Sequence, residues 1–242
     1  MTTDIYEQII DKLIQLVTDG TLKPNDKVYS ENRMSLSLGV QRSQVREVYT
    51  GLEILGILEG RRGEGTFFKP SHNPITFKVL FLMMLMEESS IEDITQARKI
   101  FEMGAAELAA QNRTEEDIKE LERCLEVMRT SKDPKEVIEA DNTFHFTIGK
   151  ASGNEIINNM MKIISGYIST IVDENWHNIM QKNQKDIHSN SIEQHADIVD
   201  AIKQRKGYMA RLLMDNHIND VMNIIYVNKS QRKSPFKSKM DD

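Results

Sequence analysis

The sequence is poor in cysteine, with Cys124 as the single thiol in 242 residues. One thiol cannot form an intrachain disulfide, which excludes the small secreted proteins that disulfides hold together. The first ten residues, MTTDIYEQII, also lack the basic and then apolar pattern of a secretory signal peptide. We therefore expect a cytoplasmic protein.

Long apolar runs are also absent. The most apolar run, VLFLMMLM, has eight residues, from Val79 to Met86. A membrane-spanning helix needs roughly 20 such residues. We expect no membrane partner, and we expect this run to lie in a helical core or at a dimer contact.

Positive charge is scarce as well. The formal net charge is −6, and residues 1–70 contain nine Lys or Arg against ten Asp or Glu. Phosphate neutralisation by basic residues supplies most non-specific affinity for DNA. DNA binding by this chain would therefore depend on a few focused arginines and on two copies acting together.

Residues 1–70 have the helix-capping and turn residues of a winged helix-turn-helix domain. Apolar residues at helical spacing predict a first helix over 4–17, and Ser30 and Gly39 bound a short second helix. A third helix is predicted over 42–55, followed by two short strands around a glycine-rich turn. This is the layout that presents a recognition helix to the major groove.

Residues 71–228 predict an all-helical antiparallel bundle of six or seven helices, so the fold class is mainly α. Two prolines in 69–74 mark a linker, and the polar segment 229–242 is expected to be a disordered tail. Ser90, Thr114 and Asp133 are predicted N-caps. The predicted helices cover residues 75–86, 91–111, 114–129, 134–151, 155–180, 188–204 and 207–227.

Arg42 and Arg46 lie four residues apart on the third predicted helix, so both guanidinium groups share the face opposite the apolar stripe. A guanidinium matches the O6 and N7 atoms of guanine, while Ser43 and Gln44 can reach a phosphate or an adenine edge. The alternative is a solvated face on which Arg46 pairs with a nearby carboxylate such as Glu47 or Glu53.

Four short runs add to this pattern: Leu38-Gly39-Val40-Gln41-Arg42, Val45-Arg46-Glu47, Leu55-Gly56-Ile57-Leu58 and Gly63-Glu64-Gly65-Thr66. Together they resemble the DNA-binding domain of the GntR family of regulators. Two departures stand out: Asn32 occupies the place of the family's usual arginine, with Arg33 one position later, and Pro24-Asn25 replaces a Pro-Gly turn.

The resemblance implies that the recognition helix contacts base edges, that the wing approaches the minor groove, and that a homodimer binds a palindromic double-stranded operator. Glycine at position 65 suits close backbone approach. The expected DNA contacts are Arg33, Arg42, Ser43, Gln44, Arg46, Arg61, Arg62 and Gly65.

Four potential metal ligands fall on three of the predicted helices. Asp141 and His145 are one helical turn apart and share a face. If the last two helices form an antiparallel hairpin, His195 and His217 each lie eleven residues from Lys206 and face each other at one level. Three imidazoles and one carboxylate make a plausible site for Zn²⁺, with Ni²⁺ or Mn²⁺ as alternatives.

Taken singly, a histidine is more often an ordinary hydrogen-bonded side chain than a metal ligand, and His72, His177 and His188 keep that interpretation. The wider pattern, however, includes Arg98 and Glu102, Ala106 to Ala110, Asp141 to His145, Ala151 to Asn154, His195 and His217. From about residue 91 to 220, this pattern resembles the FCD ligand-binding domain of the FadR-like subfamily.

This second resemblance implies that Asp141 and the three histidines bind a divalent metal. It also implies that the carboxylate of a small organic acid coordinates this metal while pairing with Arg98. The alternative role of Arg98 is a surface pair with Glu102, worth about 0.3–0.5 kcal/mol.

The sequence therefore predicts a DNA-binding transcriptional repressor controlled by a carboxylate effector at a metal site. We expect no enzymatic activity, because the chain has no HExxH motif, no GxSxG elbow and no phosphate-binding loop. The alternatives are a metal-dependent enzyme and a direct metal sensor, in which the ion itself is the signal.

Overall fold

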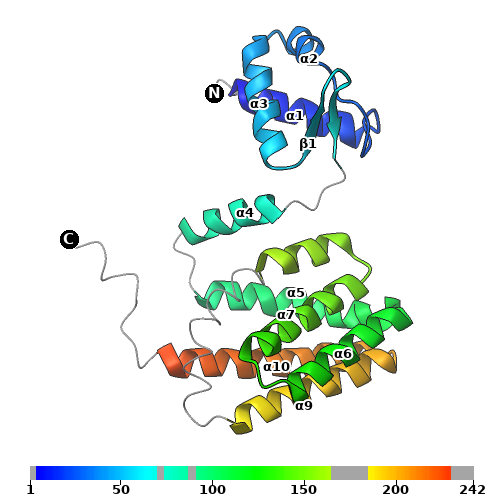
Figure 1. The fold of residues 1–242 in the computed structure, drawn as a ribbon, viewed down its shortest axis with the longest axis vertical. Coiled ribbons are helices and arrows are strands. Elements are labelled where there is room, and N and C mark those ends of the chain that lie inside the picture. Colours follow the sequence, from blue (N-terminus) through cyan, green and yellow to red (C-terminus); the bar gives the residue numbers. More distant parts are fainter. Residues whose placement is uncertain (1–3, 70–73, 87–90, 165–184, 230–242) are drawn as a thin grey trace, which may run out of the picture. The chain divides into compact units, whose positions relative to one another are not determined.

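The computed structural model describes residues 4–69, 74–86, 91–164 and 185–229. The chain divides into two compact units, residues 1–80 and 81–242, and it is mainly α, as the sequence predicts (Figure 1). The predicted boundary near residue 70 falls in the undescribed stretch 70–73 and stays a prediction. Among the described residues, none of the helices combines the length and apolar character needed to cross a membrane.

The first unit contains the predicted three helices and hairpin. The two strands pair antiparallel, with Leu58 opposite Phe68. The Ser30 hydroxyl accepts a hydrogen bond from the Arg33 amide at the start of the second helix, and Gly39 ends this helix with φ of 68°. The elements are α1 (Ile5–Thr18), α2 (Glu31–Leu38), α3 (Arg42–Ile54), β1 (Leu58–Arg61) and β2 (Gly65–Phe68).

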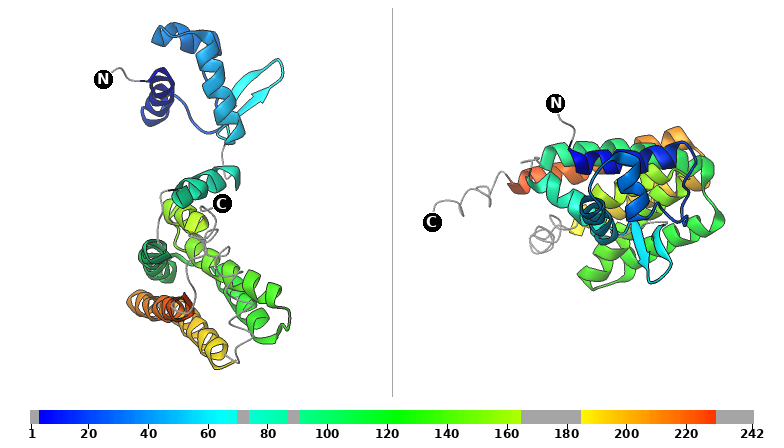
Figure 2. Two further views of the ribbon diagram at one scale, coloured as in Figure 1. Left: turned by 90° about the vertical axis from the view of Figure 1, so that its left-hand side faces the viewer. Right: turned by 90° about the horizontal axis from the view of Figure 1, so that it is seen from above.

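One apolar cluster joins these elements. Tyr49 on α3 also forms a hydrogen bond in this cluster, because its hydroxyl donates to the Tyr29 carbonyl at 2.7 Å. The hairpin lies beside α3 (Figure 2), so the helix is covered on one face and exposed on the other. The cluster is formed by Ile9, Leu13, Leu16, Leu22, Val28, Met34, Val45, Val48, Tyr49 and Leu58.

Asn25 adopts the backbone conformation that glycine usually provides in the turn before α2. Its φ is 74°, in the left-handed region that glycine adopts most easily and asparagine tolerates. The Asn25 amide donates to the Phe68 carbonyl at 2.9 Å, and Lys27 pairs with Phe67 as an isolated bridge. The turn thus fastens the chain to the hairpin without the usual Pro-Gly sequence.

Helix α4 (Pro74–Met86) contains the apolar run from Val79 to Met86. Leu82, Met83 and Met86 have exposed side chains. The described side chains of this run therefore do not form a bundle core, which was one of its two expected roles. The dimer contact stays a prediction.

The second unit is a bundle of antiparallel helices, and its caps form at predicted sites. Thr114 and Asp133 cap the starts of two helices, with Pro134 in the first turn. Residues 155–164 are also helical. The remaining elements are α5 (Ile91–Asn112), α6 (Glu115–Thr130), α7 (Pro134–Ala151), α9 (Lys185–Lys203) and α10 (Gly207–Lys229).

Several sequence-based expectations lie outside the described residues. They are the linker residues 70–73, the Ser90 cap, the second part of the helix predicted over 155–180, and the tail beyond residue 229.

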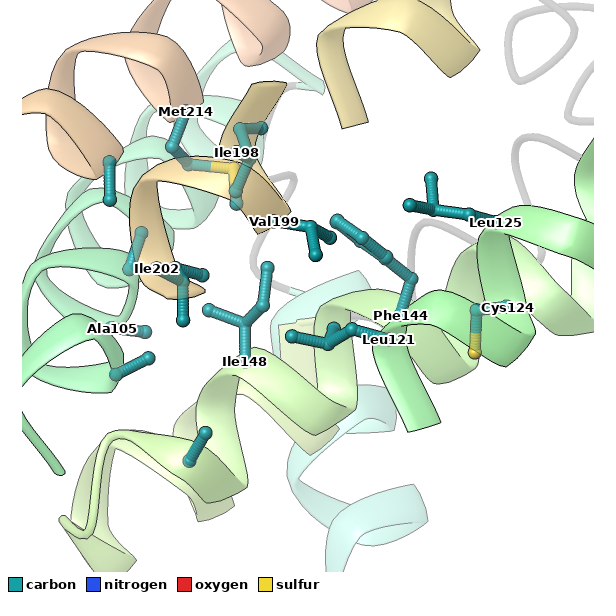
Figure 3. Packing of buried hydrophobic residues seen from close by; sticks show 14 of the residues in the cluster. Ala105, Leu121, Cys124, Leu125, Phe144, Ile148, Ile198, Val199, Ile202 and Met214 are labelled. Carbon is teal, nitrogen blue, oxygen red and sulfur yellow. The ribbon is translucent and has the colours of Figure 1, made fainter. Parts of the chain in front are cut away.

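Helices α9 and α10 form the predicted antiparallel hairpin (Figure 1). Arg205 takes φ of 58° in the connection, and the Lys206 amide donates to the Ala201 carbonyl at 2.9 Å. The hairpin packs on α5, α6 and α7 around an apolar cluster that includes Leu121, Phe144 and Ile198 (Figure 3).

Replacing Asn25 by Ala should destabilise the turn by about 1 kcal/mol, because alanine resists the left-handed conformation. Asn25→Gly should be at least as stable as the wild type in this turn. Hydrogen exchange of peptides spanning residues 20–30 measures the difference, and slower exchange in Asn25→Ala than in Asn25→Gly would contradict the expectation.

Candidate metal centre and nucleic-acid interface

Three histidines from three helices meet inside the second unit. His145 comes from α7, His195 from α9 and His217 from α10, and each residue is at most 2% exposed. One ring nitrogen of each lies within 4.8 Å of the others. This spacing is compatible with three nitrogen ligands around a single divalent ion.

Asp141 lies at the edge of this cluster. Its Oδ1 atom is 3.5 Å from Nε2 of His195, and its Oδ2 atom is 3.9 Å from Nε2 of His145. The Asp141 side chain is 41% exposed, in contrast to the histidines. The structure thus brings together all four residues that the sequence singled out, with the carboxylate on the solvent side.

The Nε2 atoms of the three histidines, called the inner nitrogens below, have few hydrogen-bond partners without an ion. Nε2 of His195 faces Nε2 of His217 at 3.1 Å, so a neutral pair forms one hydrogen bond only if one of them carries its proton there. Nε2 of His145 is buried and has no hydrogen-bond partner among the described residues. Burying an unsatisfied polar atom costs about 1–3 kcal/mol. A divalent ion would satisfy these nitrogens, so the donor set fits a metal.

Two of the outer ring nitrogens face oxygen atoms. Nδ1 of His145 lies 2.5 Å from Oε2 of Glu102, and Nδ1 of His217 lies 3.2 Å from Oε1 of Gln194. An oxygen acceptor at Nδ1 favours the ring tautomer that leaves Nε2 free for a metal.

Burial keeps two of the rings neutral. It lowers the pKa of His195 to about 4, although the Asp141 carboxylate acts in the opposite direction. Burial and the neighbouring histidines hold the pKa of His217 well below its usual range. Both rings are therefore uncharged at neutral pH, the state that binds metal ions.

Arg98 and Glu102 form a buried ion pair on α5, next to the histidines. Their side chains are 8% and 2% exposed, and Nε of Arg98 donates to Oε1 of Glu102. Burial alone would raise the pKa of Glu102, but Arg98 and His145 outweigh it and hold this pKa at about 2. The pair considered in the sequence thus exists, but it lies in the interior rather than on the surface.

On α3, Arg42 and Arg46 point away from the first core. Their side chains are 61% and 59% exposed, and both pair with Glu31 of α2. Nε of Arg42 lies 2.8 Å from Oε2 of Glu31, and Arg46 uses both Nε and Nη2 at 3.1 Å. The carboxylate partner is therefore Glu31 and not Glu47, which accepts a hydrogen bond from Tyr6 at 2.6 Å.

The other expected DNA contacts differ in their surroundings. Ser43 is exposed, while Oε1 of Gln44 accepts a hydrogen bond from the Gln41 amide at 2.9 Å, which occupies this oxygen in helix capping. The guanidinium of Arg33 stacks on Tyr29, with its central carbon 3.6 Å from the ring centroid.

In the wing, Arg61 pairs with Glu59 and stacks on Phe67, while Arg62 is exposed. Gly65 has φ of 108°, and a Cβ atom there would lie 2.6 Å from Cε of Lys27. The Lys27 side chain can move aside, but the positive φ is strained for any residue with a Cβ atom, so the backbone conformation favours glycine at position 65 independently of DNA.

Sequence reasoning missed Glu31, Gln194 and Asp220, which accepts a hydrogen bond from Gln194. Gln194 precedes His195 directly, but Gln and Asp are common on helix surfaces, and no spacing rule marked them. Glu31 begins a different helix from the arginines that it pairs with, so helical periodicity could not reveal it.

Comparisons with known proteins agree with this architecture. Residues 5–68 match the family model of bacterial regulatory proteins of the gntR family, and residues 93–220 match the FCD domain. The transcriptional regulator LutR of Bacillus subtilis is 30% identical over 211 residues, which cover 87% of this chain and 96% of that protein.

Two Escherichia coli proteins are also similar over most of their length. The Glc operon transcriptional activator is 27% identical, covering 90% of this chain and 87% of the relative. The putative L-lactate dehydrogenase operon regulatory protein is 28% identical, covering 90% and 84%.

Among solved structures, Streptococcus agalactiae GntR superposes with a TM-score of 0.59 at 26% identity and covers 90% of this chain and 99% of that one. The chain therefore belongs to the GntR family of bacterial regulatory proteins, and it has the helix-turn-helix plus FCD architecture of the FadR-like subfamily.

Proposed function

We propose that this transcriptional regulator is a cytoplasmic homodimeric repressor whose affinity for a palindromic operator is set by a small organic acid at a metal site. The observation that carries the proposal is the cluster of His145, His195 and His217 with Asp141 at its edge, beside the buried Arg98. One E. coli relative is named as an activator, so a transcription assay with and without the acid tests whether this chain represses.

On the DNA side, Arg42 is the best candidate for reading guanine. Its pair with Glu31 uses Nε, so the Nη1 and Nη2 edge takes no part in that pair and suits the O6 and N7 atoms of guanine. Arg46 spends Nε and Nη2 on the same carboxylate, which leaves Nη1 for a base or a phosphate.

On the metal side, Asp141 and the three histidines would hold the ion. One oxygen and three nitrogen donors suit Zn²⁺ best, and Ni²⁺ and Mn²⁺ are alternatives. When bound, the ion supplies a Lewis-acidic position for an effector carboxylate.

The charges around the site favour an acid that binds with the metal. Glu102 already neutralises Arg98, and Asp141 adds a further negative charge, so an acid entering without a cation would meet no net positive charge from these three side chains. A divalent ion reverses this balance. Arg98 then orients the acid through the guanidinium edge that Glu102 does not use.

Replacing Arg42 by Ala should weaken operator binding about 10- to 100-fold, because a bidentate arginine–guanine contact contributes about 1–3 kcal/mol. Arg46→Ala should weaken it less, because only Nη1 of Arg46 lies outside its pair with Glu31. The operator is first selected from random duplexes with the wild type, and affinity is measured by fluorescence anisotropy. Arg123→Ala, which removes an exposed arginine from α6, is the control of equal charge. Equal affinity of all three variants would exclude these arginines as DNA contacts.

The stability of the metal-free protein should fall as the pH falls. An unfolded histidine takes up a proton near pH 6.5, but folded His195 does so only near pH 4. The contribution of neutral His195 to the free energy of unfolding is therefore complete above pH 6.5. It decreases by about 1.4 kcal/mol per pH unit as the pH falls from 6.5 towards 4. Thermal unfolding in chelator should show a smaller pH dependence for His195→Gln, and identical slopes would contradict the assignment.

A panel of small acids should raise the thermal midpoint of the metal-loaded protein and leave the chelated protein unchanged. L-lactate is included because one relative is named for an L-lactate dehydrogenase operon. Arg98→Lys keeps the charge beside Glu102 but loses the planar fork, so it should bind the acids at least about 10-fold more weakly. A metal that alters operator affinity alone, with no acid effect, would instead indicate a direct metal sensor.

A further inference from the structure

Gln194 connects the metal cluster to a carboxylate outside it. It precedes His195 on α9, and both of its partners lie on α10. Its Oε1 atom is 3.2 Å from Nδ1 of His217, and its Nε2 atom donates to Oδ2 of Asp220 at 2.6 Å. The three side chains form a relay from an exposed acid to a buried imidazole.

The chemistry of this relay fixes its direction. An ionised carboxylate only accepts hydrogen bonds, so the amide nitrogen of Gln194 must face Asp220. Its carbonyl oxygen then faces His217, and this oxygen also only accepts. The proton of the His217 ring must therefore sit on Nδ1, and a neutral imidazole has only one.

This arrangement determines the state of the inner nitrogen of His217, Nε2. With the proton on Nδ1, Nε2 presents its lone pair to Nε2 of His195, 3.1 Å away. With Gln194 in place, only His195 can donate between the two rings; without it, the His217 proton could move to Nε2 and donate to Nε2 of His195 instead. A metal would then have to break that bond and shift the proton before it could bind.

We propose that Gln194, oriented by Asp220, is a positioning residue that holds His217 in its metal-binding tautomer. The proposal rests on the metal site proposed above. His145 uses a different device, since its Nδ1 faces the buried Glu102 directly. Outer partners of this kind typically change metal affinity by about 10- to 100-fold when they are removed.

The first experiment removes the amide. Gln194→Met keeps the length of the side chain but cannot accept strongly from Nδ1, so Zn²⁺ affinity, measured by competition with a chromophoric chelator, should fall about 10- to 100-fold. Gln204→Met is the matched control, because Gln204 also donates to an aspartate, Asp200, at the end of the same hairpin. It should bind Zn²⁺ like the wild type.

The second experiment tests direction. The double variant Gln194→Glu/Asp220→Asn exchanges donor and acceptor in the outer hydrogen bond but keeps an acceptor against Nδ1, so it should restore Zn²⁺ affinity to within a few-fold of the wild type. Asp220→Ala changes only an exposed side chain and should give a smaller loss than Gln194→Met. A loss that the double variant does not restore would overturn the relay.

The third measurement needs no metal. Long-range ¹H–¹⁵N NMR spectra of the metal-free full chain should show the His217 proton on Nδ1 in the wild type and on Nε2 in Gln194→Met. A proton on Nε2 in the wild type, or unchanged Zn²⁺ affinity in Gln194→Met, would refute the role of Gln194. A wild type that shows the Nδ1 proton but binds no metal would refute the proposed metal site and leave the relay intact.

Discussion

The second unit is organised around the burial of three imidazoles at one point. Helices α7, α9 and α10 each contribute one ring. Helix α5 contributes the ion pair of Arg98 and Glu102, whose opposite charges lie beside the rings. Polar nitrogens in an apolar interior need partners, and here most of the inner ones have only each other. The helices must therefore meet at a fixed level, so the cluster that forms the proposed metal site is also a constraint on the fold.

Both units arrange charge by the same means, in that a carboxylate from a neighbouring element or turn holds a cationic or polar group in place. Glu31 gathers the two arginines of α3 on one side, and Glu102 holds Arg98 and contacts His145. The settings differ, because the arginines of α3 are mostly exposed and screened by water, whereas the Arg98 pair is buried. The exposed pairs contribute little to stability and mainly limit side-chain freedom.

Much of this architecture could be predicted from the sequence. Caps such as Ser30 and Asp133 marked helix starts, and the equal distances of His195 and His217 from Lys206 placed both rings at one level. Helical periodicity shows which side of a helix faces inward, but not which neighbour it meets. The burial of Arg98, the pairing of Glu31 and the relay through Gln194 depend on packing between helices, so no local pattern could reveal them.

The short connection between α9 and α10 has a consequence for how this protein can vary in evolution. Three residues, 204–206, join the helices, and Arg205 already occupies the left-handed region. Each additional residue within either helix would turn the following side chains by about 100° and move one histidine away from the other. An insertion or deletion within either helix between His195 and His217 would therefore separate the two rings, whereas the connection between α6 and α7 contains none of Asp141, His145, His195 and His217.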